Sequence, residues 1–342
     1  MSTLKELAAL AGVSTTTVSV VLRGEADLRK ISKTTQKKVL DAAKSVGYQT
    51  NLAARRLRTV GGKRTVIALY WATDFRAPMM VRFLHGLQRV IVNDSHRVDI
   101  IIRPYTNGCL NEVTSPQDLG MYNAAIICNA SQKDLEELER TTLFIPIVLY
   151  NRHSHKFCTV TIDDYQLGSK PAHIFASRGH KNAAIITSKP VFTNMQLRTS
   201  GFIKTGLSLG LKTTNVVYQH NSMGGGFEGA SMLCKLAEKP DCIFFGSDAM
   251  AMGAMRAFVR YGIKIPQDME CISVGNGDRD QEEFAITSLS NVQIPMEDMA
   301  EKCLQLLLKI LDGDINETYS CEFPVIYHQL ESCGANLEPK IE

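Results

Sequence analysis

The stretch TLKELAALAGVSTTTVSVVL, residues 3–22, predicts two short helices joined by a tight turn. Thr3 and Glu6 have the spacing of a capping box, in which each side chain bonds a backbone N–H of the first helical turn. Gly12 follows the first apolar run, at a position where glycine commonly ends a helix. Ser14 can cap the second helix, which begins directly after it. Two eight-residue helices separated by such a turn are typical of a helix-turn-helix.

The second predicted helix has a face rich in hydroxyl groups. Val18, Val21 and Leu22 have the spacing to face the other helices of the head. We expect the remaining side chains to lie largely outside: Thr15, Thr16, Thr17, Ser19 and Val20. A small helical bundle with a solvated hydroxyl face would show the same pattern. The pattern by itself therefore does not distinguish such a bundle from a helix whose exposed face contacts a partner.

The charge distribution favours a nucleic-acid partner. Residues 1–64 carry thirteen Lys and Arg against four Asp and Glu, a net +9 that leaves −6 on the rest of the chain. A basic head on a mildly acidic body indicates a polyanion partner at one end only. The segment GYQTNLAARRLRT, residues 47–59, extends this pattern, with three arginines and Leu57 on a helix-compatible stretch. Beside a helix-turn-helix, this segment indicates a second DNA contact.

These motifs resemble a known family. TLKELAALAGVSTTTVSVVL and the following N-x-x-A-R-x-L at 51–57 are similar to the lac repressor and purine repressor (LacI) family of bacterial transcription regulators. Further similarity lies in PIVLYNR, VTIDDYQLG, FGSDAMAMGAMRAF and GIKIPQDMECISVG, in the order of the family, so the resemblance covers nearly the whole chain.

The resemblance implies where DNA is bound. In the family, the second helix reads base edges in the major groove, and the linker folds as a hinge helix whose leucine wedges into the minor groove. By resemblance, Thr15, Thr16 and Val20 read bases, and Leu57 is the wedge. The expected DNA contacts are Thr3, Ser14, Thr15, Thr16, Thr17, Ser19, Val20, Arg23, Asn51, Ala54, Arg55 and Leu57.

Two positions of the DNA-binding part depart from the family. Val20 stands where an arginine is usual, and it can pack on a thymine methyl group but cannot hydrogen-bond guanine. Thr50 stands where the hinge usually has proline. We therefore expect an operator unlike the common family half-site, with Arg23 as a candidate for recovering a guanine or phosphate contact.

Beyond the head, short apolar runs alternate with amphipathic segments. This alternation predicts an α/β fold with two doubly wound, parallel-sheet subdomains like those of periplasmic binding proteins. The expected organisation is a helix-turn-helix domain at 1–47, a hinge at 48–60, a core at 61–332 and a tail at 333–342. Within the core we expect an N-subdomain of about 61–160 plus 291–320 and a C-subdomain of about 161–290 plus 321–332.

Ligands of such sheets bind outside the carboxyl ends of the strands. The residues expected to contact a small-molecule effector are Thr73, Asp74, Phe75, Asn129, Asp163, Asn194, Arg198, Asn221, Ser247, Asp248 and Asn276. Arg198 and Asp163 match family effector contacts. Each also has a purely structural interpretation: Arg198 as a surface ion pair, Asp163 or Asp164 as a helix cap, and Asp248 as a cap at a strand-to-helix turn.

The effector positions depart from the family too. Gly277 stands where the family has a ligand aspartate, and Asn221 aligns with an aromatic platform. These losses disfavour a simple sugar, unless Asn276 or Asp278 compensates. A phosphorylated or acidic ligand, or a partner protein in place of the ligand, are the alternatives.

A glycine motif, GGGFEG at 224–229, satisfies the dinucleotide-binding pattern G-x-G-x-x-G. It follows a predicted strand, and Asp248 lies at about the right distance onward for a ribose. However, NSM separates strand from glycines and the motif lies late in the chain, so a flexible cleft loop is the preferred interpretation. A nucleotide-sensing or redox regulator with the same DNA-binding head is the alternative function.

The sequence contains no catalytic nucleophile motif and no phosphate-binding P-loop, so we expect a binding protein and not an enzyme. The nine cysteines are odd in number and lack a C-x-x-C pair, and HSH at 153–155 has no further ligand at zinc-site spacing. We expect no cofactor, metal or membrane partner, and a soluble, cytoplasmic protein.

The expected function is an effector-controlled repressor that binds palindromic operator DNA as a homodimer, with a tetramer left open. One short helix makes too few base contacts alone, and two half-sites multiply them.

Overall fold

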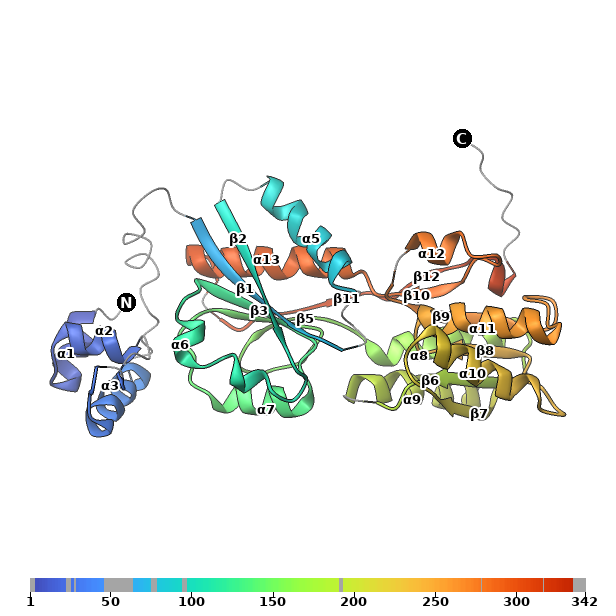
Figure 1. Cartoon of the computed structure of the whole chain (residues 1–342), viewed down its shortest axis with the longest axis horizontal. Helices are drawn as coiled ribbons and strands as arrows, with labels where there is room; N and C mark the ends of the chain where they lie inside the picture. Colours follow the sequence, from blue (N-terminus) through green and yellow to red (C-terminus); the bar gives the residue numbers. More distant parts are fainter. Residues whose placement is uncertain are drawn as a thin grey trace. The chain divides into compact units, whose positions relative to one another are not determined.

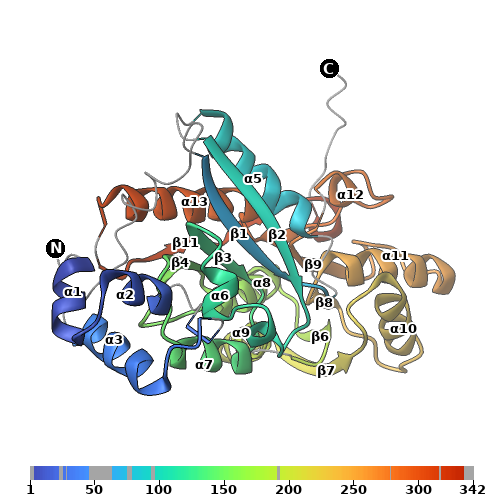
Figure 2. The ribbon, with the colours of Figure 1, turned by 60° about the vertical axis from the view of Figure 1, so that its left-hand side comes forward.

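The computed structural model describes residues 4–22, 26–27, 29–45, 64–74, 79–93, 97–190, 193–277, 279–315 and 317–334 (Figures 1 and 2). The chain divides into two compact units. The first unit comprises residues 1–74, 87–160 and 300–321, and the second unit comprises residues 75–86, 161–299 and 322–342.

The chain begins with three helices: α1 (Leu4–Ala11), α2 (Thr15–Leu22) and α3 (Lys33–Ser45). Leu7, Val18 and Val39, one from each helix, are fully buried in a common core. Gly12 takes the left-handed φ of +64° between α1 and α2, which glycine adopts without steric cost. The predicted helix-turn-helix is therefore confirmed.

The first unit contains a six-stranded sheet in the order β11-β5-β4-β3-β1-β2. The pairs that join β5, β4, β3, β1 and β2 are all parallel. The strands are β1 (Arg64–Ala72), β2 (Arg97–Tyr105), β3 (Ala124–Cys128), β4 (Ile147–Tyr150), β5 (Cys158–Ile162) and β11 (Ser320–Phe323). The helices are α6 (Pro116–Leu119), α7 (Gln132–Arg140), the 3-10 turn η2 (Leu110–Glu112), α5 (Met80–Asn93) from Leu87 on and α13 (Met296–Asp312) from Ala300 on.

The second unit contains another six-stranded sheet, in the order β12-β10-β9-β8-β6-β7. All pairs are parallel except β10 with β12. The strands are β6 (Asn182–Thr187), β7 (Lys212–Tyr218), β8 (Cys242–Phe245), β9 (Glu270–Gly275), β10 (Asn291–Gln293) and β12 (Ile326–His328). The helices are α8 (Asp164–Ser177), α9 (Thr193–Ser208), α10 (Met223–Cys234), α11 (Asp248–Tyr261), α12 (Arg279–Glu283) and the 3-10 turn η3 (Glu331–Cys333).

Helices cover both faces of the second sheet, as strand β8 shows. Ile243 and Phe245 pack in one core with buried residues of α10 and α11. Phe244, between them, stacks on Phe202 of α9 at 5.0 Å, and Phe175 of α8 meets Phe202 edge-on. Successive side chains of a strand point to opposite faces, so β8 is buried on both. The predicted doubly wound α/β fold is confirmed.

Three expected boundaries differ from the two units. Residues 75–86, expected in the N-subdomain, belong to the second unit. Residues 291–299 belong to the second unit, because β10 pairs with β9 through Asn291 and Ser273. Cys333, expected to begin a tail, is fully buried. Its neighbour Ser332 accepts a hydrogen bond from the Ser290 backbone at 2.8 Å. Hydrophobic periodicity shows that a strand exists but not which sheet it joins.

Among the described residues, no single helix is long and apolar enough to cross a membrane. Helices α1 and α2 pass by length and composition only when taken together, and they are bent by 99° at the turn between them.

Candidate DNA-binding and effector sites

Helix α2 carries the expected hydroxyl face. Ser14 caps it, because its Oγ accepts a hydrogen bond from the Thr17 backbone N–H at 3.1 Å. Thr15 and Thr16 are exposed, whereas Thr17 and Ser19 are half-buried. The exposed threonines lie in the first turn of α2, where backbone N–H groups and hydroxyls are the donors that suit phosphate.

Val20 is buried, with 7% of its surface exposed, so the expectation that it lies largely outside is wrong. The common core of the head, which contains Val21, Leu22 and Ala26, does not include Val20. The other expected DNA contacts lie outside the described residues: Thr3, Arg23, Asn51, Ala54, Arg55 and Leu57, together with Thr50.

A cavity of about 540 Å³ lies within the second unit. Four expected effector residues line it: Asn221, Ser247, Asp248 and Asn276. They follow the carboxyl ends of β7, β8 and β9, the edge at which ligands of parallel sheets bind. Five further residues with charged or titratable side chains line the cavity and were not predicted from the sequence: Arg82, His85, Arg279, Glu282 and Glu297.

Ser247 and Asp248 have clear structural roles at this edge. The Ser247 Oγ accepts from the Met250 backbone as the cap of α11 and donates to Asn221 Oδ1 at 2.6 Å. Asp248 Oδ2 accepts the backbone N–H of Gly277 at 2.6 Å. A Cβ on Gly277 would lie only 2.1 Å from that oxygen. Glycine at position 277, where the family has an aspartate, therefore leaves room for the Asp248 carboxylate. Any side chain at position 277 would displace that carboxylate.

Glu282 forms a second buried carboxyl group beside Asp248. It is 3% exposed and accepts a hydrogen bond from Asn291 Nδ2 at 2.9 Å. Burial, and then the charge of Asp248, raise the pKa of Glu282 to about 8, and burial also raises the pKa of Asp248. Near neutral pH the cavity wall therefore holds a carboxylic acid that can donate a hydrogen bond. Glu282 lies in a short polar helix, and no sequence signal distinguished it from a surface residue.

Arg198 and Asn194 meet at the carboxylate of Asp164. Arg198 Nε donates to Asp164 Oδ1 at 2.6 Å, and Asn194 Nδ2 donates to Asp164 Oδ2 at 2.5 Å. Asp163 instead caps α8 by accepting the Gln166 N–H at 3.0 Å. The structural interpretation of Asp163 as a cap is thus confirmed. The Arg198 ion pair is buried, because only 12% and 1% of the two side chains are exposed, so it is not a surface pair.

Three other expected effector residues lie in the first unit: Thr73, Asp74 and Asn129. Thr73 Oγ1 donates to the Tyr105 carbonyl at 3.2 Å, and Asp74 accepts from Asn107 Nδ2 at 2.9 Å. Asn129 follows β3 with a left-handed φ of +66° and is buried. Its Nδ2 has no hydrogen-bond partner among the described residues. Phe75 lies outside the described residues.

The glycine run at 224–229 is not a flexible loop, because all six residues lie inside helix α10. A Cβ on Gly226 would lie 1.9 Å from the Met250 carbonyl oxygen of α11. A Cβ on Gly253 of α11 would lie 1.8 Å from the Met223 carbonyl oxygen. The glycines therefore allow two helix backbones to touch, which is a packing role and not the phosphate-binding turn of a dinucleotide site.

Comparison with known proteins agrees with this geometry. Residues 3–51 match the family model of bacterial regulatory proteins of the lacI family, and residues 172–326 match the periplasmic binding protein-like domain. The probable HTH-type transcriptional repressor ExuR of Bacillus subtilis is 26% identical over 91% of this chain and 92% of its own. The catabolite control protein A of Priestia megaterium is 24% identical over 96% and 97%.

Solved structures give the same result. The lac repressor dimer bound to operator and an anti-inducer shares the fold, with a TM-score of 0.69, 18% identity and coverage of 98% and 99% of the two chains. A LacI family transcription regulator from Clostridium acetobutylicum has a TM-score of 0.74 and 34% identity over 78% of this chain and 99% of its own. With the helix-turn-helix head, the two doubly wound sheets and this similarity together, the chain belongs to the lacI family of bacterial regulatory proteins.

Proposed function

We propose that this protein is a transcriptional repressor that binds a palindromic operator as a homodimer, under the control of a small molecule held by the second unit. The observation that carries the proposal is the exposed hydroxyl face of a capped α2 on a strongly basic head. Hydroxyl groups and helix N-terminal N–H groups contact phosphates and base edges, and basic charge supplies affinity for the DNA backbone. The relatives named above as repressors support the same reading.

Exposed apolar side chains on the second unit support the homodimer. Phe284 is 81% exposed, Ile286 is 97% exposed and Val259 of α11 is 70% exposed. Contiguous exposed apolar patches often mark protein interfaces, and Phe284 and Ile286 lie two residues apart in the chain. Two copies of the head would then read two half-sites. One short helix alone makes too few base contacts for specific binding. A tetramer stays an alternative outcome of any measurement of assembly.

The cavity chemistry favours a charged effector over a plain sugar. Arg82, His85 and Arg279 line the cavity with Asp248, Glu282 and Glu297, and no Phe, Tyr or Trp is among its described lining residues. A sugar is usually held by stacking on an aromatic face, whereas arginine side chains recognise carboxylates and phosphates. Arg82 is held by Glu297, so Arg279, whose side chain is 52% exposed, is the arginine offered to a ligand. We therefore propose an acidic or phosphorylated metabolite, with Asn276 Oδ1, which has no partner among the described residues, accepting a hydrogen bond from one of its hydroxyl or N–H groups.

A nucleotide or redox sensor is the alternative function. The sequence argument for this function was the glycine motif at 224–229. That motif lies inside α10 and forms no phosphate-binding turn, so it does not support a nucleotide site. A thermal-shift screen separates the two functions, since a ligand that binds only the folded state raises its stability. Stabilisation by sugar phosphates or organic acids is expected. Stabilisation by NADH alone would favour the alternative.

DNA binding is tested by selecting bound sequences from a random pool with the full chain. We expect a two-fold symmetric site. Replacing Thr15 or Thr16 with alanine should weaken binding to it by about tenfold or more, since a good base contact contributes about 1–3 kcal/mol. Thr34→Ala is the matched control, because Thr34 is also an exposed threonine near a helix start, on α3.

The linker and Arg23 supply further tests on the same DNA. Leu57→Ala and deletion of residues 1–60 should abolish salt-sensitive operator binding. Arg23→Ala should change the preference at a guanine of the half-site. Binding of the selected site by the deletion variant, or an asymmetric site without repeats, would refute the proposed function.

A further inference from the structure

A second cluster of chemistry-bearing side chains lies at the opposite edge of the second sheet from the cavity. His180 precedes β6, Asp241 and Cys242 stand at the start of β8, and Glu270 begins β9. The strands are parallel, so these residues share the edge of amino ends. At about 3.3 Å per residue, the length of β8 and β9 separates this edge from the cavity by about 10–20 Å.

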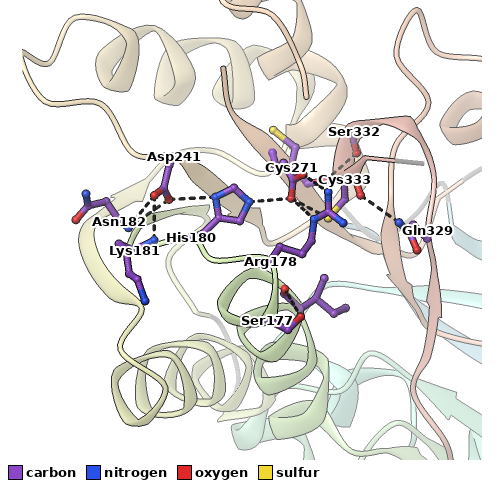
Figure 3. A network of polar contacts seen from close by, with 12 residues as sticks. Ser177, Arg178, His180, Lys181, Asn182, Asp241, Cys271, Gln329, Ser332 and Cys333 are labelled. Carbon is purple, nitrogen blue, oxygen red and sulfur yellow. Dashed lines mark hydrogen bonds and ion pairs between the residues drawn. The ribbon is translucent and has the colours of Figure 1, made fainter. Parts of the chain in front are cut away.

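Histidine 180 lies between two carboxylates (Figure 3). Its Nε2 is 2.8 Å from Glu270 Oε2, a normal hydrogen-bond distance. Its Nδ1 is 3.5 Å from Asp241 Oδ1, which is longer than a normal N–H···O bond. Two ligands at about 2.0–2.1 Å from one tetrahedral zinc ion lie about 3.4 Å apart, so the second distance fits a shared cation.

The Glu270 carboxylate is well placed to fix the imidazole. Arg178 donates to it from Nε at 2.7 Å and from Nη2 at 2.5 Å. Cys333 Sγ approaches the same group at 3.3 Å. In the neutral ring, this fixed acceptor favours the tautomer with its proton on Nε2, and the lone pair of Nδ1 then lies on the side of Asp241. A carboxylate behind a histidine is the usual outer support of a metal-binding imidazole.

The Cys242 sulfur completes the cluster. His180, Asp241 and Cys242 each offer a ligand atom, and these three atoms all lie within 4.8 Å of one another. Cys242 is fully buried, whereas Asp241 has 39% and His180 has 17% of its side chain exposed. A cation can therefore enter from the Asp241 side and meet a sulfur ligand shielded from solvent.

We propose that His180 Nδ1, the Asp241 carboxylate and the Cys242 sulfur bind one zinc-class divalent cation, with water as a fourth ligand. Nitrogen, oxygen and sulfur donors together suit zinc, and sulfur disfavours magnesium and calcium. Binding releases the thiol proton to solvent. No zinc site was expected, because the sequence lacks the ligand spacing of known zinc motifs. The fold nevertheless brings these three ligands together from the starts of β6 and β8.

The neighbouring contacts of Asp241 are compatible with this role. Its Oδ2 accepts the Lys181 N–H at 2.9 Å and its Oδ1 accepts the Asn182 N–H at 3.2 Å. Each carboxylate oxygen has two lone pairs, so one stays available to a cation. The cation would link the α8–β6 connection to β8, as a local staple independent of DNA and effector binding.

Cobalt(II) is the probe for this site, because a bound thiolate gives it a charge-transfer absorption band. The full chain is stripped with a chelator and titrated with Co²⁺, and then with Zn²⁺. We expect a thiolate band that saturates at one equivalent and is displaced by Zn²⁺. The midpoint of thermal unfolding should rise with Zn²⁺ but not with an equal concentration of Mg²⁺.

Three variants decide whether this cluster is the site. Cys242→Ser should abolish the thiolate band, and His180→Gln and Asp241→Asn should weaken Co²⁺ binding by tenfold or more. Cys109→Ser is the matched control, because Cys109 is a half-buried thiol of the first unit, and its band should be unchanged.

Circular dichroism verifies that each variant is folded. If Cys242→Ser does not fold, the two variants at partly exposed positions decide the matter. Absence of a thiolate band when Co²⁺ is added to the stripped protein, persistence of the band in folded Cys242→Ser, or an unchanged Co²⁺ affinity of folded His180→Gln would overturn the proposal.

Discussion

Arg82 Nε donates a hydrogen bond of 2.7 Å to Glu297 Oε1, and Arg82 Nη2 donates one of 2.7 Å to Glu297 Oε2. Only 10% and 13% of the two side chains are exposed, so this two-point ion pair is largely shielded from water. Arg82 also donates to the Gly277 carbonyl at 3.1 Å. The pair thus fixes one wall of the cavity and the loop that carries Asn276.

Removing one partner of this ion pair should be costly. Arg82→Ala is expected to lower the free energy of unfolding by about 3 kcal/mol, because it leaves the buried Glu297 charge with only the longer contact to Arg279 at 3.6 Å. Urea denaturation measures the change. Arg64→Ala is the control, since its pair with Asp99 is 62% and 39% exposed and should contribute about 0–1 kcal/mol. Equal effects of the two variants would contradict the shielding seen at Arg82.

Glu282 should make stability depend on pH between about 4.5 and 8. Its pKa is raised to about 8 in the folded chain. The folded state therefore keeps a proton that the unfolded state loses above about pH 4.5. This contribution is complete below pH 4.5 and is lost as pH rises to 8, with a slope of up to about 1.4 kcal/mol per pH unit.

Glu282→Gln mimics the protonated acid and should remove that slope. The difference between the variant and the parent chain, measured by urea denaturation from pH 5 to 8.5, isolates Glu282 from other titrating groups. The variant should gain relative stability as pH rises. A difference that stays constant across this range would show that Glu282 is ionised in the folded protein.

The glycines of α10 can be tested individually. Gly226→Ala should destabilise the protein by several kcal/mol, because its Cβ would lie 1.9 Å from the Met250 carbonyl oxygen. Gly224→Ala, two residues earlier in α10, meets nothing closer than 3.8 Å and should be neutral or slightly stabilising, since alanine favours helix. Thermal unfolding distinguishes the two. A tolerated Gly226→Ala would contradict the close helix crossing.

The two adjacent aspartates at the start of α8 should differ in effect. Asp163→Ala removes a helix cap and should cost about 1 kcal/mol. Asp164→Ala leaves Arg198 without its buried partner and should cost about 3 kcal/mol or more. Denaturant unfolding of both variants checks this order. The reverse order would contradict the buried ion pair of Asp164 with Arg198.

Local patterns predicted the elements well. The cap at Ser14, the stop at Gly12 and the alternation of strands and helices all appear in the structure as expected. These features depend on backbone geometry within a few residues, which the sequence encodes directly. The carboxyl-end residues Asn221, Ser247, Asp248 and Asn276 were found for the same reason, because strand ends are local features.

Features that depend on tertiary contacts were not predictable in this way. Periodicity placed Val20 outside, but its side chain is buried in the folded head. Asp163 and Asp164 are neighbours in sequence, and only the packing of α8 on α9 decides which of them meets Arg198. Arg82 acquires its role from Glu297, 215 residues away in the chain, and Glu282 acquires its role from Asp248 and Asn291, which only folding brings beside it. The expected DNA contacts outside the described residues stay predictions.

All nine cysteines lie within the described residues, and none is in a disulfide. Seven are buried, and burial raises the pKa of Cys271 and Cys303, among others. A buried thiol reacts with an alkylating reagent only after local opening exposes it. Cys128, Cys158 and Cys303 lie in the first unit, whereas Cys234, Cys242, Cys271 and Cys333 lie in the second. The order in which they are alkylated would therefore record which half of the repressor opens first, without any label added by mutation.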